Sequence, residues 1–76
     1  MYTIKRESSC VRCINVDPIK GTASVHFNDG YVYDYWNVSR FALLNLIKDS
    51  AMSLGTWVNM NLIYKQGVQY KLVDFS

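Results

Sequence analysis

The chain has 76 residues, the length of one small domain, and 50% of them are hydrophobic, which excludes an intrinsically disordered protein. Eight basic and six acidic residues give a net charge of +2, which is not the strongly basic footprint of a protein that binds a long polyanion. The longest uncharged stretch, residues 50–64, is interrupted by polar residues, and the N-terminal segment is too polar for a signal peptide. We therefore expect a soluble, cytoplasmic protein with a single domain over residues 1–76 and no membrane contact.

Cys10 and Cys13 are separated by two residues, as in zinc sites and redox-active sites. A zinc site needs four ligands, and His26, the only histidine, would bring this set to three. A redox pair needs a helix N-terminus, whereas the sequence CVRCINV is typical of a strand, in which residues three apart face opposite sides. We expect two ordinary half-buried thiols in a reducing compartment, with no metal and no cofactor.

Three strands are predicted in the first half of the chain. Residues 11–16 form the first strand, which ends at the turn-forming sequence DPIKG. Residues 22–27 form the second, in which apolar and polar residues alternate. After NDG, residues 31–36 form the third, with a tyrosine at every second position.

Two loop lengths can close the hairpin between the second and third strands. A two-residue loop would place Val25 opposite Asp34 and put a charge on the apolar face. A three-residue loop, with Gly30 in the left-handed region, pairs Val25 with Tyr33 and the preceding apolar position with Tyr35. The opposite face then carries Ser24, His26, Val32, Asp34 and Trp36. We predict the three-residue loop because it separates an apolar face from a polar one.

Two helices and a last strand are predicted in the second half. Asn37 or Ser39 can cap the first helix, and Gly55 ends it. Its apolar stripe would consist of Phe41, Leu44, Ile47, Ala51 and Leu54. Thr56 can cap a second helix with the sequence WVNMNLIYK, which Gly67 ends. The alternating tail VQYKLV predicts a final strand.

This order predicts an α+β fold, in which a small antiparallel β-sheet, made of three N-terminal strands plus a C-terminal strand, is covered on one face by two helices. The covered face should carry Ala23, Val25, Phe27 and the tyrosines. We interpret Tyr33 and Tyr35 as core residues whose hydroxyls reach the sheet edge, and the alternative is a solvent-facing platform for ring stacking.

Several spaced residues resemble the KTSC domain, a family named for its occurrence at the C-terminus of some lysyl-tRNA synthetases. The resemblance runs from Ser8-Ser9 through Asp17, Ala23-x-Val25-x-Phe27 and Gly30-x-x-Tyr33-x-Tyr35-x-x-Val38 to Ala51-x-Ser53-x-Gly55-x-Trp57-Val58-Asn59. The Tyr-x-Tyr and Ala-x-Ser-x-Gly spacings together are the specific part of the match.

The resemblance implies a small α+β domain, found as an appendage and as a stand-alone protein in bacteria and their phages, with RNA binding as a suggested activity. One departure concerns the second helix, where family members commonly carry a basic residue shortly after the asparagine that corresponds to Asn59. This chain has Leu62 and Ile63 there and no basic residue before Lys65, which weakens a phosphate contact carried over from the family.

Ser24, His26 and Asp34 share one predicted sheet face, as the members of a catalytic triad would. A triad also requires an oxyanion hole and a pocket, which an open sheet face does not offer. The four glycines are isolated turn or cap residues and form no phosphate-binding loop. We therefore interpret this face as a solvated polar surface and expect neither a catalytic residue nor enzyme activity.

Two hypotheses remain for a binding protein. In the first, the chain binds RNA, another nucleic acid or a nucleotide through residues that supply charge, hydrogen bonds and ring stacking. These residues are Arg12, His26, Tyr33, Tyr35, Trp36, Arg40, Asn59 and Lys65. In the second, it binds a protein, as a homo-oligomer or as an inhibitor of a host factor. That surface would consist of Met52, Trp57, Met60 and Phe75, for which core packing is the alternative.

Overall fold

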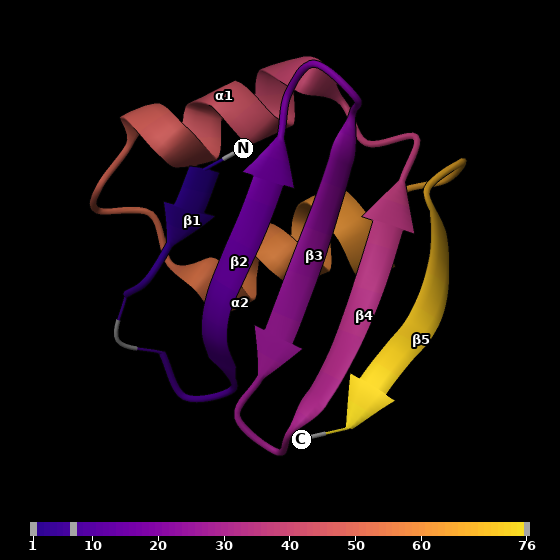
Figure 1. Ribbon diagram of the computed structural model, residues 1–76. Helices are drawn as coiled ribbons and strands as arrows, with labels where there is room; N and C mark the ends of the chain where they lie inside the picture. Colours follow the sequence, from indigo (N-terminus) through magenta and orange to yellow (C-terminus); the bar gives the residue numbers. More distant parts are fainter. Residues whose placement is uncertain (1, 7, 76) are drawn as a thin grey trace.

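The computed structural model describes residues 2–6 and 8–75, in which a five-stranded antiparallel sheet lies against a layer of helices (Figure 1). The strands are β1 (Tyr2–Ile4), β2 (Val11–Asp17), β3 (Thr22–Phe27), β4 (Tyr31–Trp36) and β5 (Gln69–Phe75). The helices are α1 (Arg40–Lys48) and α2 (Leu54–Val58), and α2 continues directly into a π-helical segment, η1 (Asn59–Ile63). The α+β class and the two helices agree with the expectation from the sequence.

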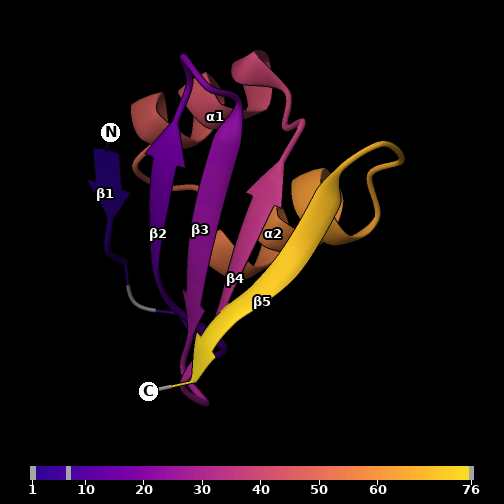
Figure 2. The ribbon, with the colours of Figure 1, turned by 45° about the vertical axis from the view of Figure 1, so that its right-hand side comes forward.

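The strands lie in the sheet in the order in which they follow one another along the chain, and every neighbouring pair is antiparallel. Figure 2 shows β1 and β5 at the two edges, with the helices on one side of the sheet. The prediction of three N-terminal strands was wrong, because β1 adds a fourth. Its three residues are too few to show an alternating pattern, and only the pairing with β2, which places Ile4 opposite Ile14, defines it as a strand.

The hairpin between β3 and β4 has the predicted three-residue loop. Ala23 lies opposite Tyr35, and Val25 lies opposite Tyr33. Gly30 has a φ of +99°, and its N–H donates to the Phe27 carbonyl at 3.1 Å. This backbone conformation favours glycine, because a Cβ atom would be strained there. This register places the apolar side chains of the hairpin on one face and the mainly polar side chains on the other, as predicted.

Helix α1 begins after Ser39, whose hydroxyl accepts a hydrogen bond from the Ala42 N–H at 3.4 Å, so that one of the two predicted caps is confirmed. The predicted length and apolar stripe were wrong. The helix ends at Lys48, its fully buried residues are Leu43 and Leu46, and Phe41 is 80% exposed. Both stripes have helical spacing, so packing against the sheet selects between them.

The second helix begins at Leu54, and the predicted cap at Thr56 was wrong. Ser53 is the N-cap, and its hydroxyl accepts a hydrogen bond from the Thr56 N–H at 3.4 Å. Gly55, predicted to end the first helix, lies in the first turn of α2. A Cβ atom at this position would lie 3.5 Å from Cys10 Sγ, which is an ordinary packing distance, so α2 lies against the segment before β2 here.

The core lies between the helices and the covered face of the sheet. Trp57 is 2% exposed, and its indole N–H donates to the Ala42 carbonyl at 2.9 Å, which connects the two helices. The Arg6 guanidinium donates to the carbonyls of Leu46 and Met52 at 2.7 Å each and connects the helical layer to the N-terminal segment. Within the described residues, no helix has the length and apolar character needed to cross a membrane.

Candidate functional site

Figure 2 shows that the helices cover one face of the sheet, and we call the opposite face the open face. Its side chains are mainly polar. Side chains alternate between the two faces of each strand, so the strand registers identify the members of this face. They include Asn15, Asp17, Thr22, Ser24, His26, Val32, Asp34 and Trp36. A polar face of this size on a small domain is available for a ligand.

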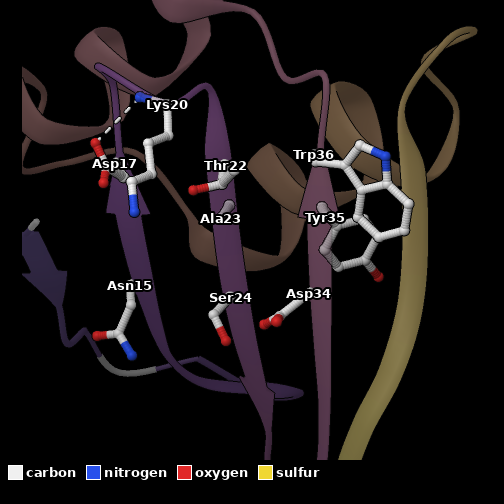
Figure 3. Close-up of a pocket in the computed structure, with 9 residues that line it drawn as sticks. All are labelled: Asn15, Asp17, Lys20, Thr22, Ala23, Ser24, Asp34, Tyr35 and Trp36. Carbon is white, nitrogen blue, oxygen red and sulfur yellow. Dashed lines mark hydrogen bonds between the residues drawn. The ribbon is translucent and has the colours of Figure 1, made fainter.

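A pocket of about 430 Å³ lies on the open face across β2, β3 and β4 (Figure 3). Asn15 lies opposite Ser24, and Ser24 lies opposite Asp34, so these three side chains form a row across the strands. In Figure 3 the Lys20 side chain extends along the β2 side, and the Trp36 indole lies on the β4 side. The lining residues are Asn15, Asp17, Lys20, Thr22, Ala23, Ser24, Asp34, Tyr35 and Trp36.

The turn between β2 and β3 holds the backbone of Lys20 at the margin of the pocket. The Asp17 Oδ1 atom accepts hydrogen bonds from the N–H groups of Ile19 at 3.1 Å and Lys20 at 3.2 Å. The Gly21 N–H donates to the Asp17 carbonyl at 2.8 Å and closes the turn. One carboxylate oxygen of Asp17 is therefore used within the turn.

The lining side chains without a hydrogen-bond partner within residues 2–6 and 8–75 include Lys20, Thr22, Ser24, Asp34 and Trp36, and the Trp36 indole is 42% exposed. Asn15 is engaged, because its Oδ1 accepts from the Thr3 hydroxyl at 2.7 Å. An exposed indole beside an available carboxylate and hydroxyl can stack on a planar ligand and accept hydrogen bonds from its N–H groups.

Tyr33 and Tyr35 lie on the covered face and not in this row of polar side chains. Tyr35 is 5% exposed, and its ring lies 6.4 Å from the Tyr33 ring and 6.1 Å from the Tyr70 ring, measured between centroids. Burial raises the pKa of the Tyr35 phenol, and the neighbouring Tyr33 and Tyr70 raise it further. This placement supports the interpretation of the Tyr-x-Tyr pair as core.

The other predicted site residues are spread over the molecule. His26 is half-buried on the open face, and its Nε2 lies 3.4 Å from the Asn15 amide nitrogen. Arg12 is exposed at the bulge of β2. Arg40 is the first residue of α1, and Asn59 is the first residue of η1.

Lys65 is exposed after η1 and lines a second pocket of about 340 Å³ in the helical layer, together with Met52, Thr56, Trp57, Met60 and Asn61. The structure therefore brings Trp36 and His26 to the open face and leaves Arg40, Asn59 and Lys65 in the helical layer.

The residues considered for catalysis or metal binding have separate surroundings. Ser24 and Asp34 are cross-strand neighbours, but no hydrogen bond joins either of them to His26 within the described part of the chain. Cys10 is exposed, Cys13 is buried, and both thiols are free. Among the described residues, no three His, Cys, Asp or Glu side chains lie close enough to share a metal ion.

Sequence reasoning missed Asn15 and Lys20 as pocket residues and treated Ser24 and Asp34 as solvated surface. The sequence did contain a signal for three of them. Polar residues alternate along β2, β3 and β4, and pairing of these strands places Asn15, Ser24 and Asp34 side by side on one face. The Lys20 contribution had no such signal, because it comes from a turn.

A search of solved structures finds the same architecture in the crystal structure of a KTSC domain protein from Yersinia pestis, with a TM-score of 0.72. The chain has the KTSC domain fold. The match covers 95% of this chain and 96% of the other chain at 22% sequence identity, and it confirms at the level of the fold the resemblance seen in the motifs. No family model and no curated protein matches the sequence.

The residues that carry the resemblance have structural places within the KTSC fold. Tyr33 and Tyr35 lie on the covered face of β4, Ser53 caps α2, and Gly55 lies in the first turn of α2 beside Cys10. Trp57 fills the core between the helices and the sheet. These motif positions therefore support the fold. Asp17, Ala23 and Tyr35, which also belong to the resemblance, line the open-face pocket as well.

Proposed function

We propose that the protein is a non-catalytic binding module for nucleotide units, either free nucleotides or short segments of single-stranded RNA, and that it binds them on the open face of the sheet. The observation that carries this proposal is the pocket in which the exposed Trp36 indole lies beside the unpartnered Asp34 carboxylate and Ser24 hydroxyl. Bases stack on aromatic side chains, and their edges hydrogen-bond to nearby polar groups.

The size and charge of the pocket favour a short ligand. A volume of about 430 Å³ lies within the range of small-ligand sites and suits one nucleotide unit. Lys20 is the one basic residue in the lining, against Asp17 and Asp34. A long polyanion gains little from such a balance, so stacking and hydrogen bonding contribute more than counterion release. The suggested RNA-binding activity of the KTSC family is consistent with this ligand class.

Isothermal titration calorimetry with nucleoside monophosphates and with a short single-stranded RNA of mixed sequence, at low salt, tests the proposal. We expect Trp36→Ala to weaken binding by at least about fivefold, the lower end of the contribution of one stacked base. Phe41→Ala is the matched control, because Phe41 is an exposed ring on the helical layer. Equal effects of the two substitutions, or no binding by the wild-type protein, would contradict the proposal. The two ligand types show whether a free nucleotide suffices.

The second candidate function is self-association through β5. This strand is at an edge of the sheet and pairs with β4 alone in the described part of the chain. Its side chains Tyr70, Leu72 and Val73 are 67%, 48% and 53% exposed. An exposed apolar edge strand is a template for pairing with a further strand. Met60 is also exposed, Met52 is partly buried, and the Phe75 side chain lies outside the described part.

Native mass spectrometry over a range of concentrations tests this candidate. We expect a dimer that Leu72→Lys converts to a monomer. Ile19→Lys is the control, because Ile19 is 89% exposed in the turn between β2 and β3, away from the β5 edge. A monomer at all concentrations excludes self-association, and a retained host protein in the spectrum would indicate a protein partner in its place.

A further inference from the structure

The part of the open-face pocket between β3 and β4 presents hydrogen-bond acceptors. Asp34 contributes two carboxylate oxygens, and Ser24, opposite it on β3, contributes a hydroxyl that can also accept. Neither side chain has a partner within residues 2–6 and 8–75. A ligand that complements this part of the pocket must therefore bring N–H donors, and a pair of neighbouring donors would satisfy both carboxylate oxygens.

The position of Trp36 specifies the shape of that ligand. Asp34 and Trp36 are two residues apart on one strand and face the same side, so their Cα atoms are about 7 Å apart. In Figure 3 the Asp34 carboxylate points from β4 toward β3, whereas the Trp36 ring lies on the β5 side of β4. A flat heterocycle that stacks on the indole and extends over β4 brings one edge toward that carboxylate. The ligand should thus be planar, with its donors along one edge.

Among the four common RNA bases, guanine is the one that meets this requirement. Its Watson–Crick edge presents the N1–H and the N2 amino group side by side, and a carboxylate accepts from both at once. Adenine and cytosine place a ring nitrogen acceptor next to their amino group, and uracil places a carbonyl on each side of its N–H. A carboxylate faces at least one lone pair in each of those three bases.

We propose that the open-face pocket selects guanine, with Asp34 accepting from the N1–H and N2 amino groups and Trp36 stacking on the purine ring. Lys20 lies on the opposite side of the pocket, two strands from β4, which is about 10 Å at the usual strand spacing. Because the guanine edge faces Asp34 and the ring lies over Trp36, the ribose phosphate extends away from Lys20, which takes no part in this contact. This inference rests on the proposed function and names the ligand of the same site.

Calorimetric titration of the wild-type protein with GMP, AMP, CMP and UMP at low salt tests the inference. We expect GMP to bind about tenfold more tightly than the other three, in line with the discrimination supplied by a bidentate contact to a base. IMP, which lacks the N2 amino group, should lose most of that preference. Asp34→Asn should remove the preference for GMP. It should also improve binding of XMP, because the new amide N–H can donate to the carbonyl at position 2 of xanthine.

Asp49→Asn is the control for the loss of one negative charge, because Asp49 follows α1 in the helical layer and does not line the pocket. The gain of XMP binding shows that the Asp34→Asn protein is folded. Equal affinity for the four nucleotides, or an unchanged GMP preference in Asp34→Asn, would overturn the guanine assignment and leave nucleotide binding intact. Absence of binding for all four nucleotides and for short RNA would refute the proposed function and this inference together.

Discussion

Tyr33 is the centre of an aromatic cluster, and its truncation measures how much this cluster stabilises the fold. Its ring lies 5.9 Å from Phe27 in an edge-to-face arrangement. The rings of Tyr31, Tyr35 and Tyr70 lie at 6.5, 6.4 and 6.2 Å, measured between centroids. These separations are within the range in which aromatic pairs attract one another. Tyr33→Ala removes the shared partner of all four rings.

Fully buried aromatic residues contribute about 3–5 kcal/mol relative to alanine, and Tyr33 is only half-buried. We therefore expect Tyr33→Ala to lower the free energy of unfolding by about 2 kcal/mol. For a domain of this size, the same change lowers Tm by about 8–16 °C. Urea and thermal unfolding followed by circular dichroism measure both quantities.

Trp36→Ala is the matched comparison, because Trp36 is the aromatic residue of β4 that lies on the opposite face of the sheet. It should change the free energy of unfolding by less than about 1 kcal/mol, while it weakens nucleotide binding. A Tyr33→Ala protein with an unchanged midpoint and lost nucleotide binding would refute the core interpretation and would make the tyrosine face the stacking platform.

Three further predictions concern the turn, the helix and the phenol. Gly30→Val should cost more than about 1 kcal/mol at its positive φ, whereas Gly30→Asn should be milder; equal unfolding midpoints of the two variants would contradict the assigned turn. Leu43→Ala should cost about 2–5 kcal/mol and Phe41→Ala less than about 0.5 kcal/mol in urea unfolding, and the reverse order would show that the other face of α1 is buried. The raised pKa of Tyr35 should stabilise the fold fully below pH ~10 and lose this contribution as the pH rises through the folded pKa. Urea unfolding across alkaline pH, with Tyr35→Phe as the comparison, measures it, and an identical alkaline loss in both proteins would exclude Tyr35 as the source.

The β3–β4 hairpin was predictable because its determinants are local. The alternation of side chains in both strands and the glycine at position 30 allow one register that separates apolar from polar residues, and the structure has that register. The Ser39 cap was predictable for the same reason, since a hydroxyl three residues before an N–H group needs no distant partner.

The candidate site was predictable only in part. The hairpin pattern placed Ser24, Asp34 and Trp36 on one face. The row became a pocket only when β2 added Asn15 and the turn after it added Lys20. Arg40 and Lys65 were grouped with Trp36 by residue type, but they lie in the helical layer. The types of two residues do not show whether they lie close together in the fold when long segments of the chain separate them.

The sequence by itself determined the fold class, the register of the central hairpin and its two-faced character, because each depends on residues near one another in the chain. Tertiary structure decided which side of α1 is buried, because Leu43 and Phe41 belong to stripes with equal helical spacing, and only contact with the sheet buries one of them. It also decided that Tyr2–Ile4 is a strand, because a segment of three residues is stabilised by pairing with β2 and not by its own pattern. The pocket is likewise tertiary, because its walls come from three strands and a turn that meet only when the sheet is assembled.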